Sequence, residues 1–103
     1  MPVSMAGLAF EPTFFFAGAQ LQRVEFVASA EALPDGGSVA FAELVRWGRA
    51  AFGSELASND PGTAYAAWTS TDADVYVQHV RDARRASLRL VYKARQVRDG
   101  SEL

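Results

Sequence analysis

The chain has 103 residues, of which 50% are hydrophobic and 21% are charged, and its formal net charge at pH 7 is −2. This length and composition are typical of one small soluble domain with a single core. No apolar run reaches the ~20 residues that a membrane helix needs. Because cysteine is absent, disulfides and thiolate chemistry are excluded. The first ten residues do not resemble a signal peptide, so we expect a cytoplasmic protein, or a periplasmic one if a signal peptide has been removed.

The charge is unevenly distributed along the chain. Residues 1–80 hold three arginines against nine acidic residues, whereas residues 81–98 hold six arginines and one lysine against one aspartate. The near-neutral balance therefore conceals a body of charge −6 and a segment of charge +6. The excess of arginine over lysine and the 19 alanines indicate a GC-rich, bacterial genome.

The first third of the chain predicts a β-hairpin. We expect residues 1–6 to be frayed and residues 8–28 to form two strands joined by a tight turn at Ala17-Gly18-Ala19. Pro12 interrupts the first strand, and since proline donates no hydrogen bond, this strand is an edge strand or is bent there.

The middle of the chain predicts one helix. Pro34-Asp35-Gly36-Gly37 is a turn signal, Ser38 stands where an N-cap is wanted, and apolar residues recur at helical spacing over residues 39–52. Gly48 costs ~1 kcal/mol in mid-helix relative to alanine, so we expect the helix to approach a sheet closely there. Residues 54–62 predict a polar loop, and residues 97–103 a second frayed end.

Residues 63–95 predict three strands separated by short polar turns. The last is the clearest, because Leu88, Leu90, Tyr92 and Ala94 alternate with polar or charged residues. The element order is then ββαβββ. One helix and one sheet face can each be buried only against the other, so the predicted fold class is α+β, a single antiparallel five-stranded sheet with one helix on one face. The order of the strands within the sheet is left open.

Candidate catalytic residues are few. His79 is the only histidine and shares a strand face with Val75 and Val77, which we expect to be the inward face. A metal site normally needs three or four ligands, and a histidine at the end of a strand is the simpler reading. Asp72 and Asp74 flank a turn, where aspartate caps backbone amides, although paired carboxylates also serve acid–base chemistry. We therefore predict no enzyme, no metal and no cofactor, and rank catalysis by His79 with Asp74 or Asp82 last.

The basic segment is the most informative feature. Arg81, Arg84 and Arg85 surround the last turn, and alternation projects three further basic residues from the solvent face of the last strand, with one tyrosine on the neighbouring strand. The predicted binding residues are Tyr76, Arg85, Arg89, Lys93 and Arg95. Such a face suits an acidic protein partner, single-stranded nucleic acid, or merely solvent. The acidic net charge disfavours nucleic acid.

Self-association is a further alternative. The acidic body and the basic segment are complementary, and Phe15, Tyr65, Tyr76 and Val91 are expected to supply exposed apolar contact. A homodimer through the outer sheet face or an edge strand would use both features.

The layout also resembles that of small, mostly uncharacterised bacterial hairpin–helix–sheet domains. The residues that carry the resemblance are Ala51-Phe52-Gly53 at the helix end and Tyr65-Ala66-Ala67-Trp68 in the following strand. Some proteins of this shape are periplasmic inhibitors or small domains of lipoproteins. The resemblance thus implies a binding role, that of an inhibitor, immunity-like or accessory module, and transfers no functional residues.

Overall fold

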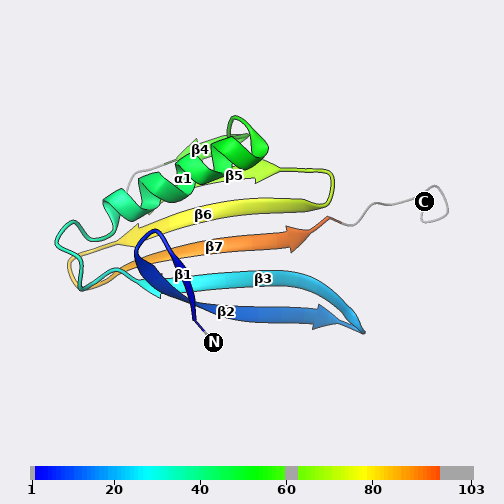
Figure 1. Cartoon of the computed structure of the whole chain (residues 1–103), viewed down its shortest axis with the longest axis horizontal. Helices are drawn as coiled ribbons and strands as arrows, with labels where there is room; N and C mark the ends of the chain where they lie inside the picture. The colour runs from blue at the N-terminus through cyan, green and yellow to red at the C-terminus, as the bar shows by residue number, and fades with distance from the viewer. Residues whose placement is uncertain (1, 60–62, 96–103) are drawn as a thin grey trace.

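The computed structural model describes residues 2–59 and 63–95. In chain order the elements are β1 (Val3–Met5), β2 (Leu8–Ala17), β3 (Gln20–Ser29), α1 (Ser38–Phe52), β4 (Ala57–Asn59), β5 (Thr63–Thr69), β6 (Ala73–Arg81) and β7 (Ala86–Ala94). The strands form one antiparallel sheet in the order β1-β2-β3-β7-β6-β5-β4, and α1 lies across one face of it (Figure 1).

The α+β class, the antiparallel sheet and the single helix are confirmed, but the strand count of five is wrong. The sheet has seven strands, because β1 pairs with Leu8–Phe10 and β4 pairs with Tyr65–Ala67. Residues 3–5 are therefore paired in the sheet and not frayed, and the segment after the helix is not wholly loop. Three-residue strands are too short to show an alternating pattern, so periodicity cannot reveal them. The expectations for residues 60–62 and 97–103 lie outside the described residues.

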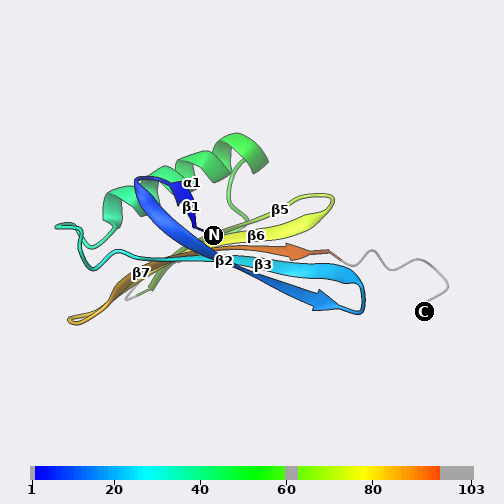
Figure 2. The ribbon, with the colours of Figure 1, turned by 60° about the horizontal axis from the view of Figure 1, so that its bottom comes forward.

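The first and last halves of the chain meet at the centre of the sheet. β3 pairs with β7 along Arg23–Ser29, so the N-terminal hairpin continues directly into the C-terminal meander. The face that α1 packs against, here called the inner face, carries the core, which includes Leu44, Trp68, Val77 and Leu90. The opposite, outer face has no helix over it (Figure 2).

The start of α1 is fixed by an aspartate. The Asp35 carboxylate accepts hydrogen bonds from the backbone N–H groups of Gly37 (2.9 Å) and Val39 (3.0 Å), and these bonds hold the pKa of Asp35 below its usual value. The N-cap is Gly37, at φ 96°, so the expectation that Ser38 occupies that position is wrong. A Cβ at Gly37 would lie 2.8 Å from the Ala30 Cβ, so both backbone angle and space require glycine.

Gly48 lies where α1 meets the sheet, as its mid-helix position predicts. A Cβ at Gly48 would overlap the ring of Trp68. This tryptophan is 2% exposed, and its indole Nε1–H donates to the backbone carbonyl of Gly53 at 2.9 Å. The helix is therefore seated on β5 through a glycine–tryptophan contact and a hydrogen bond at its C-terminal end.

Candidate functional site

His79 lies on the inner face, as predicted. It is 7% exposed, its ring stacks on Phe41 with centroids 5.6 Å apart, and its Nε2 lies 2.8 Å from the Gly36 carbonyl oxygen. Because a carbonyl only accepts, Nε2 carries the proton. The imidazole thus joins β6 to the loop before α1, which is a packing role.

The predicted acid partners of His79 are engaged elsewhere. Asp74 points to the outer face, where it accepts a hydrogen bond from Thr69 Oγ1 at 2.7 Å. Asp82 accepts from the backbone amides of Arg84 and Arg85, both at 2.8 Å, and these bonds lower its pKa. Within residues 2–59 and 63–95, no three or more histidine, aspartate or glutamate side chains gather in a metal-binding group.

Four of the five predicted binding residues lie together. Tyr76 is directly opposite Val91 in the β6–β7 ladder, so Arg89 and Lys93, two residues to either side of Val91, share its face. Arg95 follows at the end of β7, where its Nη1 donates to the Ser70 carbonyl (3.1 Å) and its Nε lies 3.9 Å from Asp74. These side chains form the centre of the outer face.

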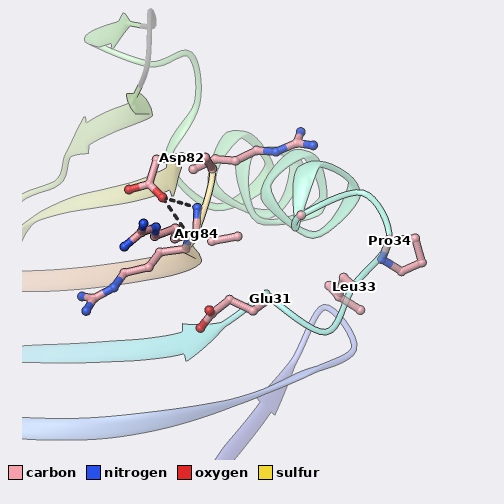
Figure 3. Close-up of a pocket in the computed structure, with 10 residues that line it drawn as sticks. Glu31, Leu33, Pro34, Asp82 and Arg84 are labelled. Atoms are coloured by element: carbon pink, nitrogen blue, oxygen red, sulfur yellow. Dashed lines mark hydrogen bonds between the residues drawn. The ribbon is translucent and has the colours of Figure 1, made fainter.

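Arg85 stands apart from the other four, in the β6–β7 turn. Together with the β3–α1 loop, this turn borders a shallow pocket of about 200 Å³ (Figure 3). Arginines 81, 84 and 85 line it, but so do Glu31 and Asp82. In Figure 3, Asp82 and Arg84 lie on one side, and Glu31, Leu33 and Pro34 on the other. The pocket thus carries both positive and negative side chains, and the Asp82 carboxylate is already hydrogen-bonded to two backbone N–H groups of the turn.

The outer face is less basic than its sequence segment. β3 brings Arg23 and Glu25 alongside β7, and Glu25 lies between two arginines, 3.0 Å from Arg23 Nε and 3.7 Å from Arg89 Nε. The Arg23 contact is an ion pair without hydrogen-bond alignment. Strand order, which the sequence left open, thus decides how much of the +6 charge stays uncompensated. Among the described residues the face carries Arg23, Arg89, Lys93 and Arg95 against Glu11, Glu25 and Asp74.

Val91 is not part of the exposed apolar contact surface that the sequence predicted. It was predicted to be exposed on the outer face, but its exposed fraction is 0%. Its cross-strand neighbours are Glu25 and Tyr76, and Arg89 and Lys93 flank it along β7. The aliphatic stems of Arg89 and Lys93 and the ring of Tyr76 are long enough to cover it from water. Val91 therefore anchors the face and offers no contact to a partner.

Sequence reasoning missed the most exposed aromatic side chains. Phe14 and Phe16 are 54% and 63% exposed and lie on the inner face of the hairpin, whereas Phe15 points outward, with the Arg23 guanidinium 4.3 Å from its ring centroid. The available signal was the run of three phenylalanines itself. Exposure depends on where the helix lies, which periodicity does not report.

Comparison of the chain with protein-family models, with curated proteins and with solved structures gives no match. No helix in the described part of the chain is both long and apolar enough to cross a membrane.

Proposed function

We propose that this chain is a non-enzymatic protein-interaction module that binds an acidic protein surface through its outer face. One observation supports the proposal: Tyr76, Arg89 and Lys93 stand side by side on adjacent strands of a face that α1 leaves open. Tyrosine and arginine are the residues that most often dominate binding energy at protein interfaces. A sheet also holds such side chains at fixed spacings, which lowers the entropy lost on binding.

The cations at this face have unequal freedom to meet a partner. Arg89 is partly satisfied by Glu25, and Arg95 by Asp74 and a backbone carbonyl. Lys93 lies between Arg23 and Asp74 on the neighbouring strands and is exposed. Arg23 is ion-paired with Glu25 at 3.0 Å, so an acidic partner residue would interact most favourably around Lys93, with Tyr76 supplying apolar area.

Single-stranded nucleic acid is the second candidate for the same face. Exposed arginines beside Tyr76 and Tyr65 are the elements of a stacking platform. Four cations against three carboxylates leave a charge of only about +1 on the described part of the face, whereas binding to phosphates depends on several uncompensated cations. The charge balance favours a protein partner.

The test compares two double variants with the same change in charge. Arg89→Gln with Lys93→Glu alters the outer face, and Arg84→Gln with Arg46→Glu alters the β6–β7 turn and the exposed side of α1. Each is immobilised beside the wild type and exposed to nuclease-treated lysate of the source organism at low and high salt. The proposal expects one defined protein to be retained by the wild type and the control pair but lost from the outer-face pair.

Retention of the same protein by both variants would assign binding to another surface. A labelled single-stranded oligonucleotide, titrated at low salt against all three proteins, decides the alternative. Binding that is lost from the outer-face pair and falls steeply with salt would replace the protein partner by nucleic acid.

A further inference from the structure

The inner face of the sheet is only partly covered. α1 runs over β5 and β6, and β1 is paired beside the start of β2, but the end of the hairpin where β2 turns into β3 extends beyond both (Figures 1 and 2). We call this extension, Pro12–Val24, the distal hairpin. Its inner side leaves Phe14, Phe16 and Leu21 exposed by 54%, 63% and 43%.

These exposed residues continue an aromatic row that begins on the helix. Trp47, 38% exposed, meets Tyr92 edge to face with ring centroids 6.2 Å apart. Tyr92 is opposite Val24 in the β3–β7 ladder, and Val24 is opposite Phe14 in the β2–β3 ladder. The row therefore crosses from the helix to the edge of the sheet as one continuous apolar surface, which we call the inner aromatic row.

The distal hairpin carries almost no charge. From Pro12 to Gln22 the chain has no acidic or basic side chain. Exposed sheet regions normally carry lysine or another charge that prevents unwanted association. Two copies of this segment can face each other without bringing like charges together, so the surface is electrostatically suited to itself.

The shape of the distal hairpin also suits contact with a second copy, because it carries both a hollow and an exposed aromatic ring. Beside Leu21, a hollow of about 160 Å³ has a largely apolar lining that includes Val24, Ala73, Tyr92 and Ala94, together with Gln22, Arg23 and Asp72. A cavity of about 150 Å³ is enough to hold a benzene ring. Phe16 is the most exposed large hydrophobic side chain of the hairpin and is paired with Leu21 next to this hollow.

We propose that the distal hairpin is a homodimer interface, in which the inner aromatic rows of two copies pack face to face about a two-fold axis. Phe16 of each copy enters the hollow of the other, which makes the contact isologous and closed at two chains. The second hairpin takes the place beside α1 in the layer above the sheet and covers Phe14, Leu21 and Trp47. The outer face stays free, so this interface does not depend on the function proposed for that face.

The exposed area is sufficient for a weak dimer only. At 150–250 Å² for a whole aromatic side chain, the exposed parts of Phe14, Phe16 and Trp47 amount to roughly 250–400 Å² per chain. Two copies thus bury roughly 500–800 Å² of aromatic surface, to which Leu21 adds, and this stays below the roughly 1,200 Å² of stable interfaces. We therefore expect a concentration-dependent dimer rather than an obligate one.

A lipid surface is the competing occupant, because exposed phenylalanines can enter a bilayer. The inner aromatic row, however, begins at Trp47 on the helix and lies along a hollowed face, whereas a bilayer would be met by the hairpin turn and by phenylalanines on both sides of the strand. Phe15 distinguishes the two occupants, since it lies on the same strand as Phe16 but on the opposite face.

The experiment measures self-association of Phe16→Glu and Phe15→Glu beside the wild type by sedimentation velocity over a wide range of concentration. We expect a reversible wild-type dimer, a dissociation constant raised at least about tenfold by Phe16→Glu, and a small effect of Phe15→Glu. Circular dichroism confirms that each variant is folded. Should Phe16→Glu fail to fold, Leu21→Gln replaces it.

Trp47 supplies an independent readout. Its emission shifts to shorter wavelength as the wild type dimerises, while Trp68, at 2% exposed, contributes a constant background. A wild type that stays monomeric at every concentration, or a dimer that Phe16→Glu leaves intact, overturns the proposal. A wild type that stays monomeric in solution but binds vesicles of anionic phospholipid would assign the phenylalanines to a membrane if Phe16→Glu and Phe15→Glu lose that binding equally.

Discussion

The two ends of the inner face are built from similar residues but are covered differently. Under α1, Trp68 and Val77 are 2% exposed or less, and a glycine in the helix allows the tryptophan ring to meet it. In the distal hairpin, Phe14 and Phe16 are more than half exposed. Apolar alternation thus defines which side of a strand can be buried, and the length and position of the helix decide which part is buried.

The chain offers two exposed surfaces that differ in charge. The outer face is charged, internally ion-paired and anchored by the buried Val91. The inner side of the distal hairpin is uncharged and apolar, and a patch of this kind on a monomer commonly marks an interaction site. A single chain can therefore use one surface for its own copy and the other for a different partner.

The largest expected effect is a difference in stability between two single variants, each of which truncates one aromatic side chain, at opposite ends of the inner face. Trp68→Ala removes a buried ring and its hydrogen bond to Gly53, and should lower the free energy of unfolding by about 3–5 kcal/mol. Phe16→Ala, in dilute protein, should lower it by less than about 1 kcal/mol, because the ring is largely exposed already. Urea unfolding measures both.

The expected cost of Phe16→Ala depends on protein concentration. If the distal hairpin dimerises, the wild type gains stability with concentration by mass action, and the difference between it and Phe16→Ala grows. A cost for Phe16→Ala as large as that for Trp68→Ala in dilute protein would mean that the hairpin is covered within one chain.

A smaller effect with an informative sign is expected at Gly48. In an exposed helix, replacing glycine by alanine stabilises by about 1 kcal/mol. Here the added methyl would overlap the Trp68 ring, and overpacking costs about 1–3 kcal/mol. Gly48→Ala should therefore destabilise the protein in thermal unfolding, and Ala50→Gly, on the exposed side of α1, serves as the propensity control. A stabilised Gly48→Ala protein would show that α1 is held less closely than the Trp68 contact requires.

The sequence was sufficient for most of the elements but not for their neighbours. Alternation predicted the hairpin, the last three strands and the inward position of His79, and helical spacing predicted α1 and the close approach at Gly48. These are local patterns with periods of 2.0 and 3.6 residues. β1 and β4, at three residues each, are too short to display a period.

Properties that depend on strand order could not be predicted. The pairing of β3 with β7 places Glu25 beside Arg89 and encloses Val91, and both features changed the expected outer face. Four of the predicted binding residues do share that face, because they belong to two consecutive strands. The distal hairpin was missed as a surface for the same reason that Val91 was taken as exposed: coverage is a tertiary property.

The smallest expected effect is a pH dependence in the region that α1 covers. Arg49 in the last turn of α1 binds Glu55 in the following loop, with Nε–Oε1 and Nη2–Oε2 distances of 2.5 and 2.9 Å. This pairing lowers the pKa of Glu55 to about 2, from an ordinary value of 4.5. Because the folded-state pKa is depressed, the pair stabilises fully above pH 4.5 and its contribution disappears as the pH falls toward 2.

Glu55→Gln should therefore be slightly less stable than the wild type at neutral pH, and the two should converge at about pH 2. Salt should reduce the difference, since the pair is exposed to solvent. Glu43→Gln, which removes a carboxylate from the exposed side of α1, controls for the change in net charge. A difference between Glu55→Gln and wild type that persists unchanged at pH 2 would indicate lost packing rather than a lost ion pair. Convergence would show that the junction between α1 and the β4 edge of the sheet is held partly by charge, unlike the apolar distal hairpin.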